Sequence, residues 1–262
     1  MNLHKILVKT GRYYDKRYSK FKSTSDQIIC EYPKSGVTYL SCLLANFYNT
    51  NIEANYYNIN QIVEDRHFKS YHHDFFVIPN LLKLKKSHFE YTKSYTNVIH
   101  LFRNPIDSLI SYFNYLNSFS KYHQNDFEKF VFSRRGIDRW NSHTMSYLKV
   151  GNTIRYIPIS YERLVENPRQ FLKTHSYLLG VEGLYDKNID QAIFKSSKDY
   201  MLDFEKKYMS GGKVISQDDL FIGIKKFKKK DVKASLLKEI NNLTHKTYLK
   251  AKEVEENFFS NF

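Results

Sequence analysis

The fold is decided by one stretch of the chain, Tyr32-Pro33-Lys34-Ser35-Gly36-Val37-Thr38-Tyr39. An apolar run, residues 28–30, precedes it, and an apolar-rich segment, residues 40–47, follows it. This order predicts a strand, a turn and a helix. Pro33 at the start of the turn and Gly36 in its middle allow successive backbone N–H groups to point at one anion, together with the positive end of the helix dipole. The stretch therefore predicts a phosphate-binding loop.

Two polar side chains complete the predicted cradle. Lys34 supplies a positive charge, and Thr38 supplies a hydroxyl at the first turn of the helix. In the ATP-binding loop the lysine follows the last glycine, and a neighbouring Ser or Thr holds magnesium. Here the lysine comes two residues before Gly36, so the loop is not a Walker A motif. A P-loop kinase is therefore an alternative and not the favoured interpretation.

A second segment predicts another anion site. The apolar-biased run of residues 97–102 has the length of a strand and leads into Arg103-Asn104-Pro105-Ile106-Asp107. Pro105 suits the first turn of a helix, and Asp107 suits its positive end. A guanidinium at a strand end can hold a phosphate through two parallel hydrogen bonds, and the Ser111 hydroxyl, about two helical turns later, faces the same side. By itself, this segment could also be a helix cap with a surface salt bridge.

Together, the two segments resemble the sulfotransferases that use 3'-phosphoadenosine 5'-phosphosulfate (PAPS). Their usual motifs are Tyr-Pro-Lys-Ser-Gly-Thr-Thr-Trp and Arg-Asn-Pro-x-Asp-x-x-x-Ser-Tyr, and this chain differs by Val37 in place of Thr and Tyr39 in place of Trp. The resemblance implies PAPS as donor, 3'-phosphoadenosine 5'-phosphate (PAP) as product, and no metal. It places the 5'-phosphosulfate on residues 34–38, the ring of Tyr39 on the adenine, and the 3'-phosphate on Arg103 and Ser111.

The resemblance also indicates a general base. Lys86-Ser87-His88-Phe89 is similar to the Lys-Thr-His-Leu stretch of the cytosolic members, whose histidine takes the proton of the acceptor hydroxyl. His88 is the corresponding residue, and an imidazole suits this step because its unperturbed pKa lies near 6.5. Carbohydrate-directed branches of the family use a carboxylate instead. Glu90, Glu64 and Asp65 therefore remain alternatives.

Three weaker correspondences follow toward the C-terminus. Tyr161-Glu162-Arg163-Leu164 is similar to the Tyr-Glu-Asp-Leu stretch of the family, which places Tyr161 near the adenine. Ser196 corresponds to a hydroxyl that helps to hold the purine, although Lys198 stands where the family has an aromatic residue. The last nucleotide motif is reduced to Gly223 and several lysines. That basic run could neutralise the 3'-phosphate or could be a solvated charge run.

Composition bounds the remaining questions. The 262 residues, with 42% hydrophobic and 16% aromatic content, can bury one substantial core, and 9 Gly and 5 Pro give no sign of a long linker. Two cysteines form no disulfide framework or metal site and suit a cytoplasmic protein. The net charge of +14 suits an anionic donor and leaves room for an acidic acceptor or peripheral contact with a lipid surface. No nucleic-acid-binding module is recognisable.

The predicted fold is a single α/β domain, a parallel sheet flanked by helices in a P-loop NTPase-like three-layer architecture. Residues 1–262 form one sulfotransferase domain, with a core at about 24–235 and a C-terminal helical segment at 231–262. Ligands in such sheets bind beyond the carboxyl ends of the strands, where Lys34, His88, Arg103 and Tyr161 are all expected. The predicted acceptor is a small molecule or glycan, with a slight preference for a saccharide. A non-catalytic nucleotide or polyanion binder remains the second alternative, and the oligomeric state stays open.

Overall fold

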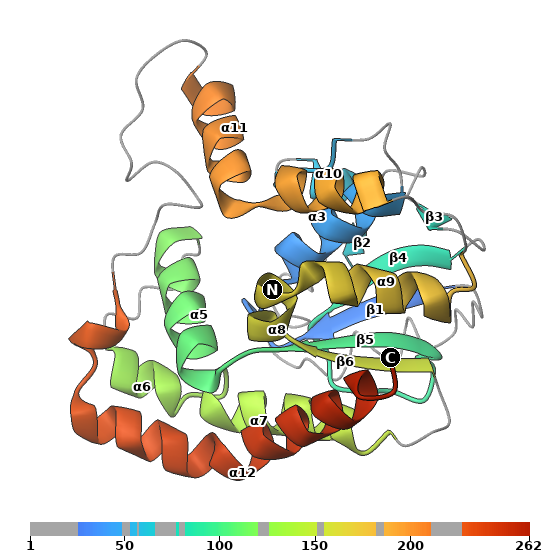
Figure 1. Cartoon of the computed structure of the whole chain (residues 1–262). Coiled ribbons are helices and arrows are strands. Elements are labelled where there is room, and N and C mark those ends of the chain that lie inside the picture. The colour runs from blue at the N-terminus through green and yellow to red at the C-terminus, as the bar shows by residue number, and fades with distance from the viewer. Residues whose placement is uncertain are drawn as a thin grey trace, which may run out of the picture.

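A computed structural model describes residues 26–48, 53–56, 58–65, 77–78, 82–119, 126–150, 155–181, 186–210 and 227–262. These residues form a single α/β domain in which helices flank a mainly parallel sheet (Figure 1). The predicted fold class is confirmed.

The described strands form one sheet. Their bounds are β1 (Asp26–Glu31), β2 (Glu64–Asp65), β3 (Val77–Ile78), β4 (Leu82–Ser87), β5 (Asn97–Phe102) and β6 (Arg155–Ser160). The order is β2-β4-β1-β5-β6 with parallel pairing throughout, and β3 pairs antiparallel with β4. Because these strands are parallel, the residues that follow β1, β4, β5 and β6 all emerge at one edge of the sheet.

Alternating side chains of the central strands enter two different cores. Ile29, Ile99 and Ile157 are neighbours in register across β1, β5 and β6, and they belong to the same buried cluster. Cys30 and Val98 point to the opposite face, where Tyr147 packs against them. Both faces are therefore covered, as the apolar strands of a parallel sheet require.

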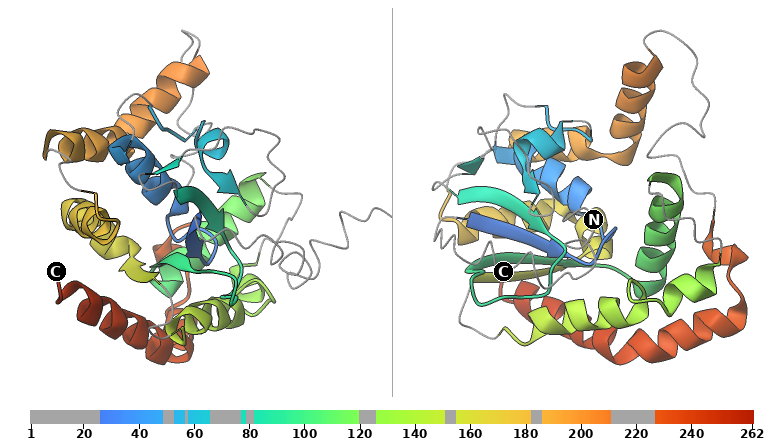
Figure 2. Two further views of the ribbon diagram at one scale, coloured as in Figure 1. Left: turned by 90° about the vertical axis from the view of Figure 1, so that its right-hand side faces the viewer. Right: turned by 180° about the vertical axis from the view of Figure 1, so that it is seen from behind.

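Helices cover both faces. Figures 1 and 2 show α3, α8, α9 and α10 on one side of the sheet and α7 and α12 on the other. The helices are α3 (Val37–Tyr48), α4 (Ile59–Ile62), α5 (Pro105–Phe119), α6 (Phe127–Val131), α7 (Ile137–Leu148), α8 (Tyr161–Glu166), α9 (Pro168–Leu178), α10 (Asp186–Ser196), α11 (Lys198–Ser210) and α12 (Ala234–Phe259), with a short 3₁₀ helix, η4 (Lys229–Asp231).

One strand that pairs with β1 was not predicted from the sequence. The apolar residues near position 75 predict a strand, and the short strand β3 forms at Val77–Ile78, but this partner of β1 is β4, with the sequence Leu-Lys-Leu-Lys-Lys-Ser. Its lysines are tolerated because acidic side chains pair with them: Lys85 lies 2.8 Å from Asp26 and 3.2 Å from Glu64. Because these lysines interrupt the apolar pattern of a buried strand, β4 cannot be recognised from its sequence pattern alone.

The long C-terminal helix α12 is attached to β6 by a buried carboxylate. Glu255 is fully buried, and it accepts hydrogen bonds from the backbone N–H and the hydroxyl of Ser160. Lys252 and Arg163 contribute positive charge beside it. Since Ser160 precedes Tyr161, the helix supports the edge of the sheet where the predicted site lies.

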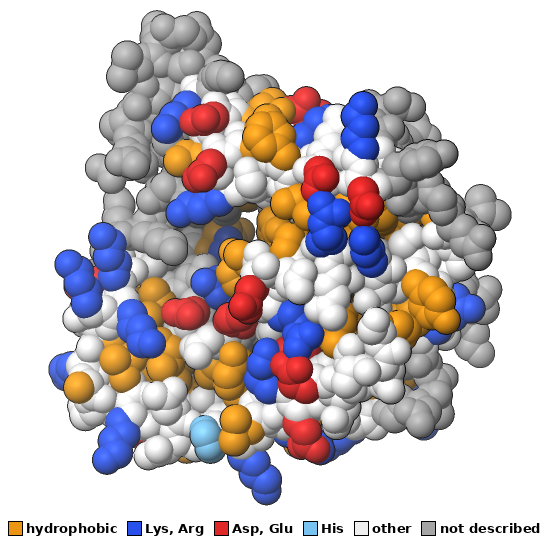
Figure 3. Space-filling model, viewed as in Figure 1, with side chains coloured by type: hydrophobic (Ala, Val, Ile, Leu, Met, Phe, Trp, Pro, Cys, Tyr) orange, Lys and Arg blue, Asp and Glu red, His pale blue; other side chains and the backbone are white. Residues whose placement is uncertain are grey.

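Charges of both signs are mixed on the face shown in Figure 3, where Lys and Arg side chains lie among Asp and Glu. Arg169, for example, pairs with Asp186 and Asp190. Of the helices in the described part of the chain, none is both long enough and apolar enough to cross a membrane.

Candidate functional site

The loop that follows β1 forms a tight turn closed by Ser35. The Ser35 backbone N–H and hydroxyl both donate to the carbonyl oxygen of Tyr32, at 3.2 and 2.8 Å. Lys34 and Gly36 have positive φ angles of 73° and 120°, and α3 begins at the next residue, Val37. A positive φ is uncommon for a residue with a side chain, and such strain concentrates at ligand-binding turns. The two positive φ angles therefore mark the turn as a candidate ligand-binding loop.

Gly36 is required by a close approach of Tyr161. A Cβ atom added to Gly36 would lie 2.4 Å from Cδ2 of the Tyr161 ring. The ring of Tyr39 meets the same tyrosine edge-on, with centroids 6.4 Å apart. Tyr161, predicted near the adenine, thus stands directly beside the loop, at the first residue of α8.

Arg103 emerges at the end of β5 and joins the same group. One guanidinium nitrogen donates to the carbonyl oxygen of Lys34 at 3.4 Å, and the guanidinium carbon lies 4.5 Å from the centroid of the Tyr161 ring. Its Nε atom is buried and has no hydrogen-bond partner among the described residues. A buried donor of this kind fits an anionic ligand, because a buried polar group without a partner is costly.

Lys34 is held above an aromatic ring. Its ammonium nitrogen lies 4.8 Å from the centroid of Tyr115 on α5. Burial lowers the pKa of Lys34, the carboxylate of Glu31 acts in the opposite direction, and Arg103 and Lys86 lower it further. Several cations meeting at one place need an anion to balance them.

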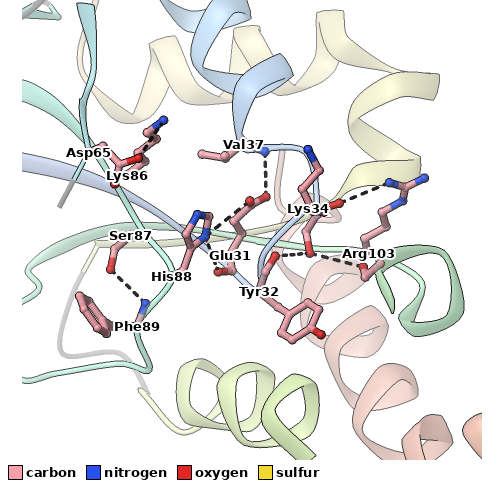
Figure 4. A network of polar contacts seen from close by, with 12 residues as sticks. Glu31, Tyr32, Lys34, Val37, Asp65, Lys86, Ser87, His88, Phe89 and Arg103 are labelled. Carbon is pink, nitrogen blue, oxygen red and sulfur yellow. Dashed lines mark hydrogen bonds and ion pairs between the residues drawn. The ribbon is translucent and has the colours of Figure 1, made fainter. Parts of the chain in front are cut away.

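A residue that the sequence analysis did not select, Glu31, lies at the centre of the site (Figure 4). It is the last residue of β1 and only 1% exposed. Its Oε2 accepts a hydrogen bond of 2.8 Å from the backbone N–H of Val37, and its Oε1 lies 3.6 Å from Nδ1 of His88. The only signal in the sequence was a charged residue directly before the loop.

Burial raises the pKa of Glu31 to about 7. The hydrogen bond from Val37 and the positive charges of Lys34 and Lys86 act against this rise. Desolvation has the largest effect on this pKa, because the buried carboxylate loses its hydration and its charged form is disfavoured. The group therefore changes its charge near neutral pH.

His88 directly follows β4, at the same edge of the sheet. Its Nδ1 lies 3.3 Å from the backbone carbonyl oxygen of Glu31, and its own carbonyl oxygen accepts a hydrogen bond from Arg139. The side chain is 24% exposed, so a substrate can approach it. The structure thus places the predicted base beside the predicted phosphate loop.

The alternative bases are engaged in other contacts. Glu64 pairs with Lys85, and Asp65 pairs with Lys86, which also donates to Asn60. Glu90 accepts a hydrogen bond from Ser142. Lys86 is another site residue that the sequence analysis did not select. Its positive charge lowers the pKa of both Glu31 and Lys34.

The remaining predicted residues are less closely gathered. Ser111 is half-buried on α5, one helical turn after Ser108, whose hydroxyl lies 3.5 Å from that of Ser35. Thr38 is half-buried in the first turn of α3. Ser196 is buried at the end of α10 and accepts a hydrogen bond from Asn46, so its contact with a purine stays a prediction. Gly223 lies outside the described residues.

In the described ranges, no group of three or more His, Cys, Asp or Glu residues has the arrangement of a metal site. Cys30 and Cys42 are buried, and neither forms a disulfide in the described part of the chain. The polar groups gathered at the edge of the sheet are chiefly cations and backbone donors, which suit an anionic ligand.

These features define a P-loop-like α/β protein with a tight turn, containing two positive φ angles, after its first described strand. The sulfotransferase domain family matches residues 24–254, and the chain belongs to that family. A search of curated proteins finds no match to the sequence.

The fold is also found in solved structures. Mouse sulfotransferase SULT7A1, complexed with PAP, is 16% identical with a TM-score of 0.60, and the match covers 94% of each chain. Retinol dehydratase in complex with androsterone and the inactive cofactor PAP is 14% identical with a TM-score of 0.62, covering 90% of this chain and 85% of that one. The same enzyme with retinol and PAP is 15% identical with a TM-score of 0.63, covering 90% and 86%.

Proposed function

We propose that the protein transfers a sulfuryl group from PAPS to a hydroxyl or amine of a small-molecule or glycan acceptor. One observation carries the proposal: the guanidinium of Arg103 reaches the carbonyl oxygen of Lys34 and lies against the Tyr161 ring, which in turn covers Gly36. The two predicted anion sites and one aromatic ring are thus adjacent. A nucleotide with phosphate groups at both its 3' and 5' positions needs this combination.

The loop residues bind and polarise the donor. The backbone N–H groups of Gly36 and Thr38 hold the sulfuryl oxygens, since the N–H of Val37 between them donates to Glu31, and Lys34 balances the charge that grows on the bridging oxygen. Arg103 and Ser111 hold the 3'-phosphate. The donor itself supplies the sulfuryl group and a phosphate leaving group.

His88 accepts the proton of the acceptor. Its place at the end of β4 puts it beside the loop, and its exposure allows an acceptor to reach it. Mixed charges on the face of Figure 3 give no support to a broad polyanion-binding surface there. A carboxylate base is less favoured because the alternative carboxylates are already paired.

The test combines binding with turnover. Stabilisation of the protein against heat by PAP, without magnesium, is expected, together with transfer of label from ³⁵S-PAPS to acceptors in a screen that includes saccharides. Lys34→Met and His88→Gln should each lower the transfer rate by roughly 100-fold or more. Stabilisation by ATP with magnesium but not by PAP would favour a kinase, whereas PAP binding without any transfer would leave a silent binder.

A further inference from the structure

The buried carboxylate of Glu31 has no role in the loop chemistry described above, yet it touches both halves of the site. Its two oxygens face different partners: Oε2 accepts from the Val37 N–H at the start of α3, and Oε1 faces the imidazole of His88. The phosphate loop and the predicted base are therefore bridged by a single side chain (Figure 4).

The contacts of Nδ1 of His88 indicate which tautomer it adopts. Nδ1 lies 3.3 Å from the carbonyl oxygen of Glu31, and a carbonyl oxygen can only accept a hydrogen bond. The carboxylate oxygen 3.6 Å away favours a hydrogen on the same nitrogen. Both contacts place the hydrogen on Nδ1 and the lone pair on Nε2, which is the arrangement needed for a base that acts through Nε2.

The surroundings of Glu31 determine how it responds to charge. Lys34 faces it from the loop and Lys86 from β4, while His88 approaches from the segment after β4. The N–H groups of Lys34 and Val37 donate to it. A carboxylate near cations and near a proton-accepting imidazole is stabilised most when that imidazole becomes positively charged.

We infer that Glu31 is a positioning residue of the transfer reaction, which holds His88 in its Nδ1–H tautomer and stabilises the imidazolium that forms. This inference rests on the proposed function. In the step it assists, the acceptor O–H or N–H bond breaks and its proton moves to Nε2 of His88. The acceptor atom bonds to sulfur, and the bond from sulfur to the bridging oxygen breaks, leaving its electron pair on the nucleotide phosphate.

The first test measures the tautomer in the wild-type protein, without any substrate. Long-range ¹H–¹⁵N NMR spectra, with the His88 signals assigned from their loss in His88→Gln, should show hydrogen on Nδ1 and none on Nε2 above neutral pH. Glu31→Gln removes the carboxylate but keeps the backbone carbonyl oxygen that also faces Nδ1, so its spectra should show a larger fraction of the Nε2–H tautomer than the wild type without a complete change. Hydrogen on Nε2 in the wild type, or the same tautomer fractions in the variant as in the wild type, would overturn the inference.

The second test is kinetic. Glu31→Gln should lower kcat roughly 10- to 100-fold while PAP binds at least as tightly, because the charge lost is one that repels the donor. In the wild type both Glu31 and His88 must lose a proton, so log kcat should rise with a slope of about two at acid pH, falling to about one in the variant. Glu128→Gln, an exposed carboxylate paired with Lys233, is the control and should match the wild type.

The two hypotheses fail differently. Absence of any transfer from PAPS by the wild-type protein would refute the proposed function, and the NMR result on the pairing of Glu31 with His88 would still stand. A kcat and a pH profile in Glu31→Gln equal to those of the wild type would refute the role of Glu31 and leave the proposed function intact. If both PAP affinity and melting temperature fell with kcat while the slope stayed at about two, the role of Glu31 would be structural only.

Discussion

The ring of Tyr161 lies so close to Gly36 that a Cβ on the glycine would approach Cδ2 of the ring to 2.4 Å. Gly36 lies in the loop after β1, and Tyr161 is the first residue of α8, so the two residues are far apart in the sequence. Their contact puts the ring that is predicted to lie near the adenine directly beside the predicted phosphate loop.

Gly36→Ala should therefore damage both stability and nucleotide binding. The substitution adds a clash with Tyr161 to the strain of a φ near 120°, and we expect a loss of about 2 to 4 kcal/mol in the free energy of unfolding and a PAP affinity lowered at least tenfold. Chemical denaturation and calorimetry measure the two effects. Gly180→Ala is the matched control: its φ is also positive, but its Cβ would meet no atom within 4 Å, so only about 1 kcal/mol is expected.

Arg103→Lys should weaken PAP binding while the fold stays intact. Lysine keeps the charge but loses the planar donor pair and the stacking on Tyr161, so the dissociation constant of PAP should rise by roughly 10- to 100-fold. Titration calorimetry gives this value. The surface variant Arg169→Lys, in an exposed ion pair, should bind PAP like the wild type. Unchanged binding in Arg103→Lys would contradict the placement of the 3'-phosphate.

Acid should destabilise the protein through its buried histidines. Burial lowers the pKa of His100 to about 3, while the unfolded chain has the ordinary value of 6.5. Between these values the unfolded state binds the extra proton, so the stability that His100 contributes by staying neutral is lost as pH falls below about 6.5, at up to about 1.4 kcal/mol per pH unit.

His100→Leu should make the dependence of unfolding free energy on pH shallower between pH 6 and pH 5 by about that slope. Denaturant titrations at a series of pH values measure it. His245→Leu, on the outer side of α12, serves as the control and should leave the slope as it is. A slope equally steep in His100→Leu would show that other groups dominate the acid response.

Glu255→Gln should destabilise the attachment of α12 to β6. The carboxylate is fully buried, accepts a hydrogen bond from Ser160 and pairs with Lys252 and Arg163. Losing its charge should therefore lower the free energy of unfolding by about 2 to 4 kcal/mol. Chemical denaturation provides the measurement. Glu253→Gln, on the same helix but exposed and paired only with Lys250 in the described contacts, should change stability by less than about 0.5 kcal/mol.

The family and the fold were predictable because local patterns carry them. The turn at residues 32–36 needs residues that accept unusual backbone angles and a helix that starts directly afterwards, and both needs are visible in the sequence. The apolar strand that ends at Arg103 is equally local. The parallel α/β fold predicted from this order is confirmed, and so is membership of the sulfotransferase family.

The strand β4 was missed because its lysines are neutralised by residues distant in the chain. Lys85 is paired with Asp26 of β1 and Glu64 of β2, and Lys86 with Asp65. A pattern of hydrophobic residues cannot reveal such compensation, since each lysine counts as polar until its partner is known.

The sequence alone determined the strand, the predicted phosphate loop and the helix after it. It also determined which types of side chain are predicted to meet the anion, because all of these depend on contacts within a few residues. The tertiary structure decided the contacts between strand ends. Pairing of β1, β4, β5 and β6 places their ends side by side, and only this arrangement lets Glu31 contact His88 and Arg103 reach the carbonyl oxygen of Lys34. Those contacts join residues more than 50 positions apart. Their energies depend on burial and distance in three dimensions, which no local pattern encodes.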